Sequence, residues 1–476
     1  MSEKHSTLAK RVDFSDIEPQ IALGPLDGRY HKEVAPLVND LSEAALNRNR
    51  LVVEIEWLIH LTEHEAVPGV KPLSSTQKEQ LRAVVTSFDA EGIKAMAVHE
   101  AVTAHDVKAV EYYLKDQMAE IGIANLGELV HFGCTSEDVN NIAYALGIRD
   151  AITDVWLPTA KSLVETLIDM ADTHKDSAML SRTHGQPATP STMGKEVAVL
   201  TYRLQRQLKR VENQEYLAKI NGATGTYAAH YVACPDTNWQ QISKTFVEHL
   251  ALDWNPLTTQ IESHDWQGEL YEAIAHFNMV LHNLCTDFWT YISLGYFTQI
   301  PKKGEVGSST MPHKINPIRF ENGEANLEVS NSLLHTLTTT LATSRMQRDL
   351  TDSSIQRNVG VAIGHSLLAI TNVTRGISRL AVSEQTLLAD LDENWEVLAE
   401  AVQMLMRAEA VRGVKGMENP YERLKELTRG NRIDAEGMKK FVKTLELEPK
   451  AEARLAKLTP ETYTGIAAKL VNHLKS

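Results

Sequence analysis

One segment of the chain combines the residue types that proton abstraction from carbon requires. Residues 307–317 place two hydroxyls, Ser308 and Ser309, six and five positions before Lys314, and Asn316 adds an amide. A serine is a weak base unless its alkoxide is stabilised, which backbone N–H groups and a nearby cation can do. This composition suits removal of a proton beside a carboxylate, because Lys314 and Asn316 would hold that carboxylate as negative charge builds on it.

A second polar segment, residues 181–190, carries a candidate acid. His184 is followed by glycine and lies among prolines, so we predict a rigid turn and not a helix face. An imidazole, with an unperturbed pKa of about 6.5, can give or take a proton near neutral pH. One histidine among 18 is more often structural, so the composition alone leaves both interpretations open.

Two more polar segments, 103–108 and 134–141, are rich in hydroxyls, amides and charges. Either could carry function or simply cap a helix, as Thr135 or Ser136 would. His60 and His64 are four residues apart and could face a metal from one helix, but no third ligand is suggested. We therefore predict that these two histidines lie on a surface helix.

The elements that position these segments are predicted to be helices. Apolar residues recur every three or four positions over five stretches, which is the helix period and not the strand period: 163–171, 193–211, 270–292, 327–341 and 359–377. Strand signals are few, so the predicted class is all-α with a bundle of long helices. We predict three helical domains: an N-terminal one at 1–124, a central bundle at 125–377 with the serine loop, and a C-terminal one at 378–476.

Composition excludes several classes of protein. The chain has 476 residues and a formal charge of −14 with no long basic run, which argues against nucleic-acid binding through phosphates. Its three cysteines form no Cys-x-x-Cys pair, which fits a reducing compartment. No signal peptide and no apolar run of about 18 residues is evident. We therefore expect a cytoplasmic protein without a membrane partner.

At this point the motifs resemble those of a known family. Gly-Ser-Ser-x-Met-Pro-x-Lys-x-Asn at 307–316, Thr-Ser-x-Asp-x-Asn at 135–140 and Thr-His-Gly-Gln-Pro at 183–187 are similar to the three shared regions of the fumarase/aspartase superfamily. Further segments resemble the branch of that superfamily that cleaves adenylosuccinate: 27–30, 103–107, 182–190, 347–353 and 420–430. The resemblance covers nearly the whole chain after the first dozen residues.

The resemblance implies a fold, an activity and an assembly. It implies an all-α, three-domain protomer in a homotetramer whose active sites are each built from three subunits. It implies a small-molecule nucleotide substrate: cleavage of adenylosuccinate to AMP and fumarate, and parallel cleavage of the succinylated aminoimidazole carboxamide ribotide. No metal or organic cofactor is implied. Two rivals remain, namely another fumarate-releasing lyase, such as one acting on argininosuccinate, and a catalytically silent protein on the same fold.

The resemblance also assigns roles to single residues. It implies that Ser308 is the general base and His184 the general acid. It implies substrate contacts at Arg29, Tyr30, Ala104, His105, Asp106, Thr135, Ser136, Gln260, Lys314, Ile315, Asn316, Asn322, Arg348, Ser353, Ser354 and Arg357. Of these, Lys314 and Asn316 are similar to the family's binders of the fumarate carboxylates. Ala104 departs from the pattern, because close relatives carry a polar or charged residue there.

Overall fold

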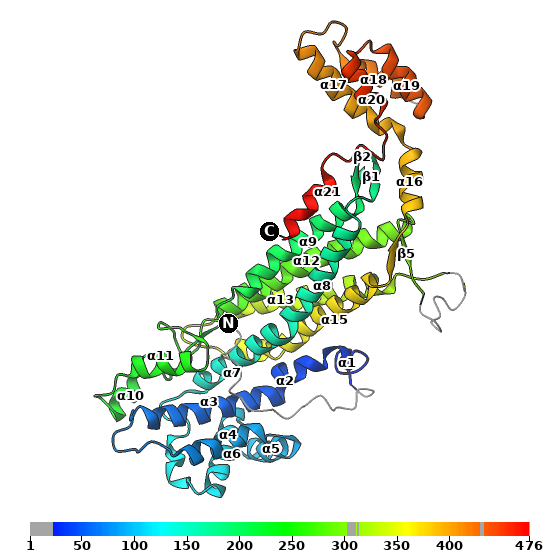
Figure 1. Ribbon diagram of the computed structural model, residues 1–476. Helices are drawn as coiled ribbons and strands as arrows, with labels where there is room; N and C mark the ends of the chain where they lie inside the picture. Colours follow the sequence, from blue (N-terminus) through cyan, green and yellow to red (C-terminus); the bar gives the residue numbers. More distant parts are fainter. Residues whose placement is uncertain (1–21, 302–310, 312–313, 429–432, 476) are drawn as a thin grey trace. The chain divides into compact units, whose positions relative to one another are not determined.

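The computed structural model describes residues 22–301, 311, 314–428 and 433–475, and it is mostly helical (Figure 1). Ser308 and Ser309 lie outside the described residues, so their predicted roles stay predictions. The chain divides into two compact units. Unit 1 comprises Met1–Lys161, Gln207–Met279 and Ala325–Thr371, and unit 2 comprises Ser162–Arg206, Val280–Glu324 and Asn372–Ser476. The predicted division into three domains stays a prediction.

Unit 1 is organised around α3, Glu43–Glu63, which begins at Ser42, whose side chain accepts a hydrogen bond from the Ala45 N–H. Most of its residues are buried, including Arg48, Arg50 and Glu54. A helix buried all round with charged residues inside needs partners for those charges. The other N-terminal helices of the unit are α1 (His31–Val34), η2 (Ala35–Leu37), α2 (Val38–Leu41), α4 (Ser75–Thr86), α5 (Ala90–Thr103), α6 (Asp106–Glu120) and η3 (Ala124–Leu129).

After η3, helix α7 (Ser136–Asp150) continues through a π-helical stretch, η4 (Ala151–Trp156), into α8 (Leu157–Thr173). α7 packs against α3. The rest of unit 1 includes α10 (Ala228–Ala233), α11 (Trp239–His249) and α14 (Thr351–Gln356), with a short parallel pairing of β3 (Leu217–Ala218) and β4 (Asp253–Trp254).

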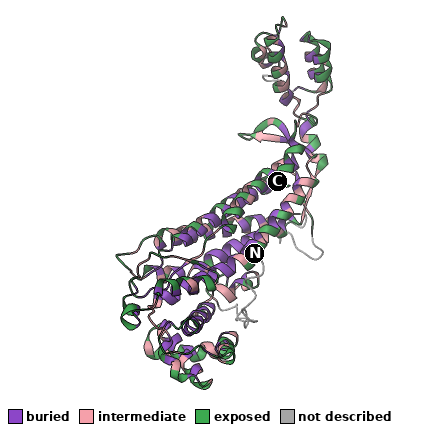
Figure 2. Ribbon diagram, turned by 60° about the vertical axis from the view of Figure 1, so that its left-hand side comes forward, coloured by how far each residue is buried: buried purple, intermediate pink, exposed green. Residues whose placement is uncertain are grey.

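The five predicted helical stretches are confirmed as α8, α9 (Met193–Glu212), α12 (Asp265–Ser293), α13 (Ile318–Leu341) and α15 (Val359–Ile377). The apolar residues that defined them are buried, except Ile292, which is half-buried. Buried residues, purple in Figure 2, follow these long helices. In unit 1, Trp156 of η4 donates to Ser366 of α15 at 2.9 Å, and Ser366 donates to Asn278 of α12 at 2.7 Å.

Unit 2 contains an antiparallel hairpin of β1 (Ala178–Thr183) and β2 (Gln186–Thr192), with a register irregularity between Met179 and Ser181. A second antiparallel pair joins β5 (Phe297–Gln299) to β6 (Leu380–Val382). The C-terminal helices share an apolar cluster that includes Met406, Met417 and Val442. Those helices and their neighbours are α16 (Glu384–Asp392), η5 (Trp395–Leu398), α17 (Ala399–Val411), α18 (Pro420–Thr428), α19 (Ala435–Thr444), α20 (Pro449–Ala456), α21 (Ala467–Leu470) and η6 (Val471–Lys475).

Within the part of the chain that the structure describes, no helix combines the length and the apolarity needed to cross a membrane.

Candidate active site

The predicted contact Asp106 begins α6 and is held by an arginine from α3. Ala104 ends α5 in the left-handed conformation, with φ of 50°, and His105 caps α6 by accepting from the Lys108 N–H at 3.3 Å. The buried Arg50 donates from Nη2 to Asp106 Oδ2 at 2.7 Å. Burial raises the pKa of Asp106, but Arg50, the Val107 N–H and Arg357 outweigh it and leave the pKa below its usual value.

A chain of polar side chains leads from Arg50 to the predicted contact Arg348. Arg50 Nε donates to Asn140 Oδ1 at 2.9 Å, and Asn140 Nδ2 donates to Glu137 Oε1 at 2.9 Å. Nη2 of Arg348 lies 3.1 Å from the same Glu137 oxygen. Glu137 and Asn140 are both buried in α7, one turn apart. The structure therefore links Asp106 and Arg348, which are far apart in sequence, through one face of α7.

Arg348 has further neighbours on its other sides. Its Nη2 lies 3.8 Å from Asp352 Oδ1, and its Nη1 lies 3.5 Å from Oε1 of Gln260, another predicted contact. Asp352 is buried, and its other oxygen lies 3.5 Å from Nε2 of the buried His264. Asp352 also accepts from the N–H of the predicted contact Ser353 at 2.6 Å. The result is a polar cluster with several of its groups removed from water.

The predicted contacts Thr135 and Ser136 stand at the N-terminus of α7, where a buried ion pair fixes the backbone. The Thr135 N–H donates to Asp138 Oδ2 at 2.9 Å. Asp138 also pairs with Lys219 Nζ at 2.8 Å, and both side chains are 0% exposed. It accepts from the N–H groups of Asn221 and Gly222 at 2.9 and 3.0 Å. Asp138 thereby ties the start of α7 to residues 219–222.

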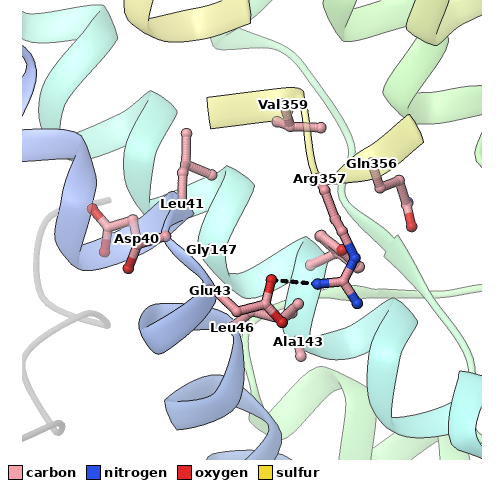
Figure 3. A pocket seen from close by; sticks show the side chains of 11 residues that line it. Asp40, Leu41, Glu43, Leu46, Ala143, Gly147, Gln356, Arg357 and Val359 are labelled. Atoms are coloured by element: carbon pink, nitrogen blue, oxygen red, sulfur yellow. Dashed lines mark hydrogen bonds and ion pairs between the residues drawn. The ribbon is translucent and has the colours of Figure 1, made fainter. Parts of the chain in front are cut away.

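A small cavity lies beside the predicted contact Arg357 (Figure 3). Arg357 forms an ion pair with Glu43, drawn as a dashed line there, and its Nη2 lies 3.5 Å from Asp106 Oδ2. Tyr144 also lines the cavity, and burial raises its pKa to about 12. The cavity has a volume of about 50 Å³, which fits a few water molecules and not a nucleotide.

The remaining predicted contacts of unit 1 are Arg29, Tyr30 and Ser354. Arg29 and Tyr30 occupy the turn before α1, and the Arg29 Cζ lies 5.9 Å from the centre of the Tyr30 ring. Tyr30 packs against an apolar cluster that contains Leu26 and Val34. Ser354 is exposed on α14.

In unit 2, the predicted acid His184 stands at the tip of the β1–β2 hairpin. His184 and Gly185 form the two-residue turn and have φ of 54° and 73°. Positive φ at both central residues is what a type I′ hairpin turn requires. The turn that we predicted is confirmed, and the residues on either side of it, 181–183 and 186–190, form strands. The side chain of His184 is exposed, and we find no hydrogen bond or ion pair to it among the described residues.

The hairpin that carries His184 is anchored within unit 2. Arg182 donates to Asp390 of α16 and to the Tyr296 hydroxyl, both at 2.8 Å. Tyr296 also donates to Asp390, and burial raises its pKa to about 12. This triangle fixes the strand two residues before His184 while leaving the imidazole itself exposed.

The other predicted contacts of unit 2 flank α13. Lys314 and Ile315 are exposed, and the Lys314 N–H donates to the Met311 carbonyl at 3.0 Å. The Ile315 carbonyl accepts from Gln299 Nε2 at 2.7 Å. Asn316 is half-buried just before α13, and Asn322 within α13 accepts from Asn372 at 2.9 Å.

Sequence reasoning missed four residues that hold the cluster of unit 1 together: Arg50, Glu137, Asn140 and Asp352. Glu137, Asn140 and Asp352 lie inside motifs that we had singled out, next to the residues we chose. For Arg50 the signal was an arginine pair, Arg48 and Arg50, directly before the largely apolar stretch 51–61. We also predicted a surface position for His60, which is wrong: His60 is buried in α3 and bonds to the Ile242 carbonyl at 3.1 Å.

Known proteins are similar to this chain over nearly its whole length. A family model described as "Lyase" matches residues 28–329, and one described as "Adenylosuccinate lyase C-terminal" matches residues 344–464. The adenylosuccinate lyase of Escherichia coli (strain K12) is 48% identical over 455 residues, covering 95% of this chain and 98% of that protein. The adenylosuccinate lyase of Vibrio cholerae serotype O1 is 46% identical, with the same shares covered.

Solved structures show the fold. A fumarate lyase from Mesorhizobium sp. BNC1 matches with a TM-score of 0.74 at 18% identity, covering 92% of this chain and 97% of that one. The 3-carboxy-cis,cis-muconate lactonizing enzyme from Pseudomonas putida matches with a TM-score of 0.70 at 21% identity, covering 92% and 96%. The family match and the fold together define a lyase with the fumarate-lyase fold. Within that class, the chain belongs to the adenylosuccinate lyase family, carbon–nitrogen lyases of purine biosynthesis.

Proposed function

We propose that the protein cleaves adenylosuccinate to AMP and fumarate, and that it cleaves the succinylated aminoimidazole carboxamide ribotide in the same way. The observation that carries this proposal is the cluster of unit 1, where α7 links Asp106 to Arg348 and Arg348 lies next to Gln260. A lyase for malate or aspartate has no ribose phosphate to bind and would not need this set of cationic and amide groups.

The proposed reaction is a β-elimination in two steps. Ser308, as the alkoxide, takes a proton from the succinyl carbon that lies beside a carboxylate. The electron pair spreads into that carboxylate, where Lys314 and backbone N–H groups stabilise it. The carbon–nitrogen bond then breaks, the pair forms the double bond of fumarate, and His184 gives its proton to the departing purine nitrogen. The alkoxide that abstracted the proton becomes a hydroxyl, and the imidazolium becomes neutral.

The burial and charge of the unit 1 cluster support its place on the nucleotide side. Arg348 and Arg357 are two of the predicted cationic contacts, and each keeps part of its side chain accessible while a carboxylate holds it. Groups that are held before substrate arrives lose less conformational entropy on binding. A phosphate carries the charge that planar, bidentate guanidinium groups bind best.

We further propose a cytoplasmic homotetramer in which each active site combines residues of three subunits. His184 is exposed at the tip of an anchored hairpin. A general acid must be held close to the nitrogen that it protonates, so we expect residues of another subunit to surround His184 and complete the site. Mixing two inactive variants, His184→Ala and Arg348→Ala, tests it. Activity should reappear when mixed tetramers form, and a mixture that stays inactive after subunit exchange would contradict shared sites.

The activity itself is tested by following fumarate release from adenylosuccinate, argininosuccinate, malate and aspartate. We expect turnover only with adenylosuccinate and with the analogous ribotide. Turnover with argininosuccinate in place of adenylosuccinate would favour the rival lyase. A lack of turnover on all four substrates would favour a catalytically silent protein.

A further inference from the structure

Glu137 is a buried carboxylate that the proposed reaction does not use. It lies in the first turn of α7, and its side chain is 3% exposed. A carboxylate removed from water is costly unless it is paired and hydrogen-bonded. One oxygen of Glu137 meets two partners, Arg348 Nη2 at 3.1 Å and Asn140 Nδ2 at 2.9 Å.

The geometry of Arg348 shows what this contact does. Nη2 is turned to Glu137, while Nε lies 3.3 Å from the Asp349 carbonyl. Nη1 lies 3.5 Å from Gln260 Oε1, which is at the outer limit of a hydrogen bond. A guanidinium is a planar fork, so fixing Nη2 and Nε fixes the direction of Nη1. Nη1, which has the weakest partner of the three nitrogens, is therefore the nitrogen that faces Gln260, another predicted nucleotide contact.

Glu137 also reaches the second half of the cluster. Asn140, which donates to Glu137, accepts a hydrogen bond from Arg50 at 2.9 Å. Arg50 in turn donates to Asp106 at 2.7 Å. Asp352 is a weaker partner of Arg348, because it stands 3.8 Å away and is engaged by the Ser353 N–H and by His264. Glu137 is thus the closest charge to Arg348 among the described residues.

We infer that Glu137 is a positioning residue, which sets the orientation of Arg348 for the phosphate of the nucleotide. This inference rests on the proposed function, and it adds a residue that touches no substrate. Two properties of Glu137 are required, namely its charge and its length. Glu137→Gln keeps the shape and one acceptor oxygen but removes the charge, whereas Glu137→Ala removes both.

The first experiment compares steady-state constants on adenylosuccinate. Loss of a hydrogen bond between charged groups predicts a rise in KM of roughly 10- to 100-fold for Glu137→Ala. Glu137→Gln should give an intermediate rise, with kcat within about 3-fold of wild type, because binding and not chemistry is affected. A KM for Glu137→Gln equal to that of the wild type would overturn the inference.

The second experiment separates positioning from a merely structural role. AMP and adenosine differ only in the phosphate, so the difference between their affinities, measured by calorimetric titration, reports the contribution of the phosphate. Glu137→Gln should weaken AMP binding by a factor similar to the rise in KM and leave adenosine binding unchanged. Equal weakening of both ligands would mean that Glu137 supports the fold of the site and does not orient Arg348.

A double-mutant cycle completes the test. In an Arg348→Ala background, Glu137→Gln should add less than about 2-fold to the loss of AMP affinity, because the group that it orients is gone. Additive losses would contradict the inference. The matched control is Glu56→Gln, which removes the charge of another buried carboxylate paired to an arginine, Arg82, at 2.6 and 2.7 Å. It should leave AMP affinity unchanged.

Failure of this inference can be told from failure of the proposed function. AMP binding is measured without turnover, so the AMP and adenosine comparison stands even if adenylosuccinate is not cleaved. Wild-type enzyme that cleaves adenylosuccinate, with Glu137→Gln indistinguishable from it, rejects only the inference. Wild-type enzyme that neither cleaves adenylosuccinate nor binds AMP rejects both.

Discussion

Arg348 in unit 1 is held by Glu137 and lies near Asp352, whereas His184 in unit 2 stands exposed at the tip of a hairpin. Asp106 shows the same pattern as Arg348, because the buried Arg50 holds it. A group that binds substrate gains from being fixed in advance, since less conformational entropy is lost on binding. The difference is that the proposed binding groups of unit 1 are held by neighbouring side chains, whereas the side chain of the proposed acid in unit 2 is exposed.

The contrast between the two units depends most on the proposal that His184 is the general acid. His184→Ala should lower kcat on adenylosuccinate by roughly 10² to 10⁴-fold, the usual effect of removing a general acid. Because His184 is exposed and its backbone turn remains, KM and thermal stability should stay close to wild type. Stopped-flow and steady-state assays of AMP formation give these constants. A variant with normal kcat, or one that loses stability instead, would contradict the assignment.

The second prediction concerns the buried ion pair that fixes the start of α7. Asp138→Asn leaves Lys219 buried with its charge unpaired, so unfolding should become easier by about 3–5 kcal/mol. Urea unfolding followed by circular dichroism gives the change. The double variant Asp138→Asn/Lys219→Met should recover part of the loss, because the unpaired charge is gone. If both variants equal the wild type, unit 1 does not depend on this pair.

A third prediction uses pH to test a buried carboxylate of unit 1 that lies outside the site. Burial raises the pKa of Glu56, but hydrogen bonds from Arg82 and His249 outweigh it and lower the pKa to about 2. The folded pKa is depressed, so the stabilisation is full above the unfolded value of 4.5 and is lost as pH falls towards 2. Glu56→Gln should therefore cost about 3 kcal/mol at pH 7 and less at pH 3.5.

Thermal melts of Glu56→Gln and wild type across pH 3.5 to 7 check this prediction. The gap between the two proteins should narrow as pH falls. A gap that is constant over this range would mean that the charge of Glu56 contributes nothing to stability. Glu56→Gln should also leave the activity at pH 7 intact, in contrast to variants of Glu137.

The smallest expected effect lies in the turn of unit 2. Gly185 has φ of 73°, and a Cβ at that position would meet no atom within 4 Å. Gly185→Ala therefore adds only backbone strain, about 1 kcal/mol. Thermal melts should show this small loss, and kcat should fall if the turn sets the direction of His184. A variant with unchanged stability would argue that the turn is not held in this conformation.

A feature of this molecule can be predicted from the sequence when it depends on residues that are close together along the chain. The long helices α9, α12 and α15 follow from apolar residues three and four apart, which is local information. The strands beside His184 were missed because prolines 187 and 190 favour a loop. Pro187 pairs with Arg182 in this two-stranded ribbon and Pro190 falls at its irregularity, which are the places where a sheet tolerates proline.

The site follows the same rule. Asp106 and Arg348 are predicted contacts because they lie in short motifs that resemble those of the family. Glu137 and Arg50 were not predicted, because their role arises from partners distant in sequence: Arg50 and Asn140 are 90 residues apart. Nothing in a local pattern tells a buried, paired carboxylate from a solvated one at the start of a helix.

The central claim is that an alkoxide at position 308 takes the proton from carbon, and one measurement tests it most directly. The rate of AMP formation is measured for Ser308→Ala enzyme at saturating adenylosuccinate, with substrate binding confirmed by calorimetry. We predict that the rate falls by roughly 10² to 10⁴-fold while adenylosuccinate still binds. A Ser308→Ala enzyme that binds adenylosuccinate and turns it over at close to the wild-type rate would contradict the account.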